Sequence, residues 1–63
     1  MFFVTISVNA HKSALCRVLD HIAGAQYSEK YHVWVIPNGE RGLVENIIGV
    51  EIYDSIADVP YGA

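Results

Sequence analysis

One stretch of the sequence, residues 9–24, constrains the fold more than any other part of the chain. Its large apolar side chains recur three and four positions apart, a spacing that places them on one face of an α-helix. These side chains are Leu15, Val18, Leu19 and Ile22. Asn9 can cap the start of the helix through its side-chain oxygen, and Gly24 can adopt the left-handed conformation that ends it. The sequence therefore predicts an amphipathic helix between these two residues.

Two segments on either side of this helix have the patterns of β-strands. Residues 2–8 alternate between two faces, and residues 31–36 form an apolar run bounded by Pro37. Both patterns are typical of strands in a sheet that packs on a helix. The fully apolar face of the first segment, which we expect to lie against the helix, comprises Phe2, Val4, Ile6 and Val8.

The second strand is apolar on both faces, so its periodicity alone does not assign its orientation. We place Val33 and Val35 against the helix. Trp34 and Ile36 then lie on the far face of the sheet, beside Phe3. The alternative assignment exchanges these two pairs of side chains.

Residues 40–48 fit a short amphipathic helix. The apolar side chains with helical spacing in this segment are Leu43, Val44, Ile47 and Ile48. Gly49 can end the helix. A strand is the alternative, but Glu45 and Asn46 would break its alternation on both faces.

A third strand is expected at residues 50–53, with Val50 and Ile52 directed inward. The order β-α-β-α-β predicts the α/β class: a small, mostly parallel three-stranded sheet with the main helix and the short helix packed on one face. An α+β arrangement with an antiparallel sheet is the alternative. We expect a single domain over residues 1–63, in which residues 56–63 form a C-terminal tail that docks weakly or joins a partner.

Composition indicates that part of the apolar surface meets a partner. The chain has 63 residues, of which 52% are hydrophobic and 17% are charged. A chain of this length buries only about 60% of the surface that its unfolded form exposes. We therefore expect contact with another protein, and a homodimer in particular.

Charge and cysteine content exclude several classes of partner. The net charge is −3, and the four Lys and Arg residues are scattered, which argues against direct binding to nucleic acid. No apolar run reaches the roughly 18 residues of a membrane span. The single Cys16 excludes an internal disulfide and a metal site with several cysteines, and zinc-ligand spacings are absent. We expect no cofactor or metal, and a reducing cytoplasmic location.

Aromatic residues are the side chains that most favour an interface. Tyr and Trp offer a large contact area with few torsions to order, and they dominate binding hot spots. An uncovered sheet face that carries such residues is costly to leave in water. The candidate interface residues are Phe3, Tyr31, Trp34, Ile36, Tyr53 and Tyr61.

The loops after the strands suggest an alternative function, the binding of an anion or another small molecule. In a parallel sheet these loops meet at one edge, where backbone N–H groups and a basic side chain can hold a phosphate or carboxylate. The candidate residues are Asn9, His11, Lys12, Asn38, Gly39 and Arg41.

No arrangement of nucleophile, base and acid can be assigned from the sequence, so we expect no enzyme. The leading hypothesis is a small non-catalytic protein-binding module that acts through an aromatic sheet face or a strand edge. Its small size is in keeping with inhibitors or adaptors of the kind that phages and mobile elements encode.

Overall fold

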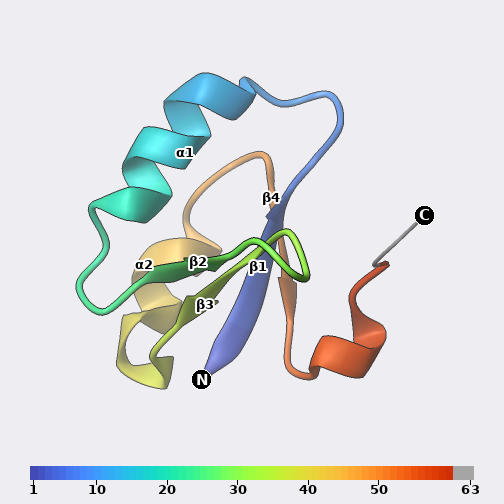
Figure 1. Cartoon of the computed structure of the whole chain (residues 1–63). Coiled ribbons are helices and arrows are strands. Elements are labelled where there is room, and N and C mark those ends of the chain that lie inside the picture. The colour runs from blue at the N-terminus through green and yellow to red at the C-terminus, as the bar shows by residue number, and fades with distance from the viewer. Residues whose placement is uncertain (61–63) are drawn as a thin grey trace.

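The fold consists of a four-stranded sheet and two α-helices, which the computed structural model describes over residues 1–60 (Figure 1). In chain order the elements are β1 (Phe2–Ile6), α1 (Lys12–Asp20), β2 (Gln26–Ser28), β3 (Val33–Ile36), α2 (Arg41–Glu45) and β4 (Val50–Tyr53). Short 3₁₀ helices lie at η1 (Asn38–Glu40) and η2 (Ile56–Asp58). In Figure 1 both α-helices lie on one side of the strands, and η2 lies on the other.

The strands lie in the order β2-β3-β1-β4, and all three pairings are antiparallel. The protein is therefore of the α+β class. The expected three-stranded parallel sheet and the β-α-β-α-β order are wrong. The segment between α1 and β3 contains an additional strand, β2, which pairs with β3 as an antiparallel hairpin. The observed order, β-α-β-β-α-β with two interleaved β-α-β units, is the order of ferredoxin-like folds.

The antiparallel register decides which side chains share a face. Val4 lies opposite Trp34 on β3 and Ile52 on β4, and Phe2 lies opposite Ile36. Side chains that are directly opposite one another lie on the same face. This face packs on the helices, and its buried core consists of Phe2, Val4, Leu19, Trp34, Ile36 and Val44. The placement of Trp34 and Ile36 on the far face is therefore wrong.

The predicted main helix is confirmed but is shorter than expected. It begins at Lys12, and the residue before it, His11, makes no capping hydrogen bond through its side chain. The expected cap at Asn9 is wrong, since that residue lies in the turn that follows β1. At the C-terminal end, the His21 ring Nδ1 donates to the Arg17 carbonyl at 2.7 Å. The helix thus ends well before Gly24.

Strand β2 was not expected from the sequence. Its central residue, Tyr27, lies opposite Trp34, and the two ring centroids are 4.6 Å apart. Tyr27 remains 44% exposed, whereas Trp34 is 6% exposed. The hairpin of β2 and β3 therefore places a second aromatic ring against the indole.

The preferred prediction of a short helix within residues 40–48 is confirmed, although only Arg41–Glu45 are α-helical and η1 precedes them. The helix ends at Glu45, before the expected stop at Gly49, which lies in the turn before β4 with a φ of +101° that favours glycine. Strand β4 follows as expected, and Val50 and Ile52 pack against the core.

After β4 the chain turns into η2, where the Ser55 hydroxyl oxygen accepts a hydrogen bond from the Ala57 N–H at 3.2 Å. Val59, which follows η2, is buried. Within residues 1–60, no helix has both the length and the apolar composition needed to cross a bilayer.

Candidate functional site

The most exposed large apolar side chains lie where β1 ends and β4 begins. Val8 is 97% exposed and Ile48 is 94% exposed. Between them, the Ser7 N–H donates to the Gly49 carbonyl at 2.8 Å and extends the β1–β4 ladder by one pair. We call Val8 and Ile48 the apolar pair. The expected inward position of Val8 is wrong, because β1 ends at Ile6 and the alternation stops there.

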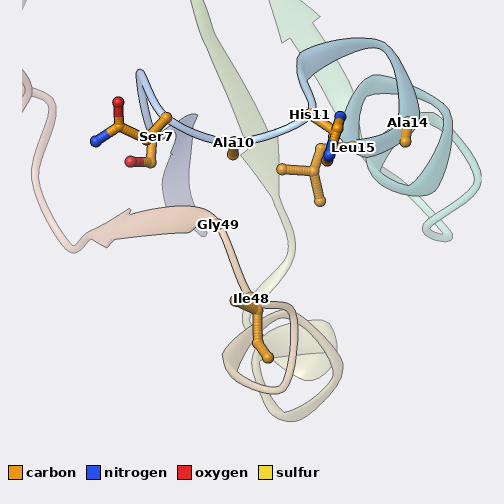
Figure 2. A pocket seen from close by; sticks show the side chains of 8 residues that line it. Ser7, Ala10, His11, Ala14, Leu15, Ile48 and Gly49 are labelled. Atoms are coloured by element: carbon orange, nitrogen blue, oxygen red, sulfur yellow. The ribbon is translucent and has the colours of Figure 1, made fainter.

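An apolar groove of about 430 Å³ lies beside Ile48. Its walls come from the turn after β1, the first turns of α1 and the loop before β4 (Figure 2). The residues that line it are Ser7, Asn9, Ala10, His11, Ala14, Leu15, Ile48 and Gly49. We call this hollow the apolar groove.

Gly49 keeps this groove closed at its base. A Cβ at this position would lie 2.9 Å from the Ala10 Cβ and 3.0 Å from the Leu15 Cδ1. The missing side chain thus lets α1 and the turn after β1 approach the loop before β4. In Figure 2 the Leu15 side chain projects from α1 toward this loop.

The border of the groove includes the N-terminus of α1. His11, which lines the groove, directly precedes the first residue of this helix, and the first turn of the helix contains no acidic residue. The N-terminus of a helix carries a partial positive charge. The groove can therefore accommodate an apolar side chain that has a negatively charged group next to it.

The helix-free face of the sheet carries a second, less exposed apolar surface. Phe3 lies opposite both Val35 and Tyr53, so the three side chains form a row across β3, β1 and β4. All three are half-buried. The Tyr53 hydroxyl donates to Glu51 Oε2 at 2.6 Å, and this hydrogen bond raises the pKa of Tyr53 above its ordinary value.

The other predicted interface residues lie elsewhere. Trp34 and Ile36 are in the core on the opposite face. Tyr31 lies in the turn before β3, half-buried, with the Lys30 Nζ 5.2 Å from the centroid of its ring. Tyr61 lies outside the described residues. The structure therefore brings two of the six predicted side chains together, in the row described above.

The predicted anion-binding residues do not converge. Because β1 is antiparallel to β3 and β4, the loop after β1 lies at one end of the sheet, and the loops after β3 and β4 lie at the other. The first end carries Asn9, His11 and Lys12, and the other carries Asn38, Gly39 and Arg41. The expectation of a single loop cluster is wrong, since it assumed a parallel sheet.

Arg41, the proposed anion clamp, already has two carboxylate partners. Its Nη1 donates to Asp54 Oδ1, and its Nε lies 3.5 Å from Glu45 Oε2. The hydrogen bond to Asp54 is the main reason why the pKa of Arg41 is raised. The guanidinium carbon also lies 5.4 Å from the centroid of the Phe2 ring. These contacts connect Arg41 of α2 to Asp54, which follows β4, and engage the guanidinium with carboxylates of the protein itself.

A smaller hollow of about 250 Å³ lies between α1 and the β2–β3 hairpin. On its lining, the Trp34 Nε1–H donates to Asp20 Oδ1 at 3.1 Å, and Cys16 is a half-buried free thiol. No group of three or more His, Cys, Asp or Glu side chains within residues 1–60 is arranged to hold a metal ion.

The apolar pair and groove were missed at the sequence level. Val8 follows the alternation of the first strand, and Ile48 follows the spacing of the short helix, so each was assigned to a packed face. The available signals were the turn residues next to them, Asn9 and Gly49, which favour an end of the strand or helix before the apolar pattern ends.

Comparison with known proteins assigns no family to the chain. No family model matches it, and no curated protein or solved structure is significantly similar to it.

Proposed function

We propose that this protein is a small non-catalytic protein-binding module, of the inhibitor or adaptor kind, whose apolar groove takes an apolar side chain of a partner protein. The observation that carries the proposal is the nearly complete exposure of Ile48, which lines the groove, and of Val8, which lies in the chain between the lining residues Ser7 and Asn9. Burial of each such side chain favours association by on the order of 2 kcal/mol. We place this function in the cytoplasm, where the free thiol of Cys16 stays reduced.

The apolar pair supports the proposal better than the helix-free face does. The three side chains of the row on that face, Phe3, Val35 and Tyr53, are half-buried within the protein itself. They therefore have less apolar surface to lose in a complex. Trp34 is part of the core and makes no contribution to an exposed surface.

The size of the protein favours a short linear segment as the partner. A typical stable interface takes about 800 Å² from each partner. The total accessible surface of the chain is 4371 Å², so such an interface would occupy roughly a fifth of it. The groove with the exposed Ile48 at its lining is small, and it matches a few consecutive residues of a partner better than a large flat face.

Charge complementarity defines this segment further. The border of the groove carries the N-terminus of α1, directly preceded by His11, with no acidic side chain in the first turn of the helix. A segment with a large aliphatic or aromatic residue next to Asp or Glu fits both the apolar base and this positive border.

Selection from a random peptide library on the purified protein tests the proposal. Peptides that bind should share an apolar residue flanked by an acidic one, and their affinity should fall at least about tenfold for Ile48→Asp. Leu43→Asp is the matched control, because Leu43 is 62% exposed on α2 and does not line the groove. This control should bind as the unmodified protein does. Equal binding to the unmodified protein and to Ile48→Asp would refute the proposal.

A further inference from the structure

Strand β4 is an edge of the sheet, and half of its backbone polar groups point away from the protein. The hydrogen bond from the Ser7 N–H to the Gly49 carbonyl fixes the phase of the β1–β4 ladder. Residues bonded to the neighbouring strand alternate with residues that face outward. The N–H and C=O groups of Val50 and Ile52 are therefore directed outward, and within residues 1–60 no backbone hydrogen bond outside the regular elements uses them.

This edge lacks several of the features that usually prevent two strands from pairing, and Glu51 is the one charged residue of β4. Strand β4 contains neither Pro nor Lys, and its register with β1 runs without a bulge from Phe3–Tyr53 to Ile6–Val50. Proteins commonly protect sheet edges with such residues, with bulges or with very short strands. The other edge strand, β2, has three residues and is of the short, protected kind.

We infer that β4 pairs with β4 of a second copy of the chain, antiparallel and about a two-fold axis, so that the two sheets join into one. A second copy is the occupant that fits this edge. An antiparallel pair of identical strands satisfies the outward groups of both copies at once, and such isologous contacts are the usual basis of homodimers. Association also benefits a chain of 63 residues, whose own core is small.

The charge of Glu51 selects the register of this pair. With the two-fold axis at Glu51, the two carboxylates would lie directly opposite one another, which is unfavourable. With the axis at Ile52, Glu51 lies opposite Tyr53 of the second copy, and Val50 lies opposite Asp54. The hydroxyl of Tyr53 already donates to Glu51 within one chain, so the two side chains are chemically matched. The register centred on Ile52 is therefore the one we assign.

Sedimentation of the protein over a range of concentrations tests the pairing, with backbone N-methylation at Ile52 as the perturbation. The methyl group removes one outward N–H, blocks the edge and leaves the side chain unchanged. It should raise the dissociation constant of the dimer at least about tenfold. Methylation at Tyr27 is the matched control, since alternation across β1 and β3 directs its N–H outward at the β2 edge. This control should leave the dimer unchanged.

Disulfide trapping tests the register. In a Cys16→Ser background, a mixture of Glu51→Cys and Tyr53→Cys proteins should form a mixed disulfide, because a non-hydrogen-bonded antiparallel pair brings its Cα atoms to about 4.5 Å. Neither variant should form a disulfide dimer alone. A protein that stays monomeric at millimolar concentration, or a dimer unaffected by methylation at Ile52, would overturn the pairing. Disulfide formation by Glu51→Cys alone would overturn the register.

This inference does not rest on the proposed peptide-binding function. Ile48→Asp abolishes peptide binding if the groove is the binding site, and N-methylation at Ile52 abolishes the dimer if β4 is the contact. Each change is scored with both assays, so failure of one proposal is distinguished from failure of the other.

Discussion

Replacement of Trp34 with alanine should destabilise the protein strongly, because the indole is a central part of the core. The side chain is 6% exposed, packs against the tilted ring of Tyr27 at a centroid distance of 4.6 Å, and donates its Nε1–H to Asp20 Oδ1 at 3.1 Å. Truncation of a buried aromatic residue to alanine costs about 3–5 kcal/mol. For 63 residues, a total stability of about 3–9 kcal/mol is expected. The variant should therefore lose at least about a third of its free energy of unfolding.

Urea denaturation followed by far-UV circular dichroism measures this loss, since tryptophan fluorescence disappears when the single Trp is replaced. Trp34→Phe is a milder variant that keeps a ring against Tyr27 and loses the hydrogen bond to Asp20, and it should cost about 1–2 kcal/mol. Tyr27→Ala is the control, because Tyr27 lies opposite Trp34 on the neighbouring strand. It should cost less than Trp34→Ala, since Tyr27 is 44% exposed. If Trp34→Ala costs less than about 1 kcal/mol, the indole is not in the core and the assigned faces of β3 are wrong.

Three further predictions concern the turns, the ionisable groups and anions. Gly49→Ala should lower the free energy of unfolding by more than about 1 kcal/mol, because Gly49 has a positive φ and an added Cβ would meet side-chain atoms at 2.9 and 3.0 Å. Gly42→Ala should raise the free energy of unfolding by about 0.5–1 kcal/mol, because an added Cβ there meets no atom within 4 Å. Thermal melts of both variants measure these changes. Tyr53 should ionise above its ordinary pKa, and Glu51→Gln should lower this pKa in a tyrosinate absorbance titration. Since the raised pKa favours the neutral folded form, its contribution to stability is complete below the unfolded pKa and disappears as the pH rises through the folded value. Phosphate should not raise the melting temperature, because Arg41 is occupied by two carboxylates, and a shift that Arg41→Ala abolishes would contradict this assignment.

The sequence was informative where a pattern had one interpretation. The helix predicted around Leu19 and the strand predicted at residues 50–53 are both present in the structure. Every residue of Val33–Ile36 is apolar, so periodicity does not show which side chains of this strand face the helices. The pairing of Trp34 with Val4 places Trp34 on the face that packs on the helices. A register is a long-range property, set by the pairing of segments far apart in the chain.

The remaining differences arise from short elements. Strand β2 has a polar residue on each side of Tyr27, and its three residues are too few for an alternating pattern to be recognised. Without this strand, the chain could be arranged only as a parallel sheet or as an incomplete antiparallel one. The candidate site was missed for a related reason, because the exposure of Val8 and Ile48 depends on where β1 and α2 end, within one or two residues.

The most direct test of the proposed function is a titration of the isotope-labelled protein with a selected peptide, followed by backbone amide NMR. We predict that the resonances that shift belong to residues 7–15 and to Ile48 and Gly49, which surround the apolar groove. Resonance shifts confined to Phe3, Val35 and Tyr53 would contradict this account, since they would place the binding surface on the helix-free face of the sheet.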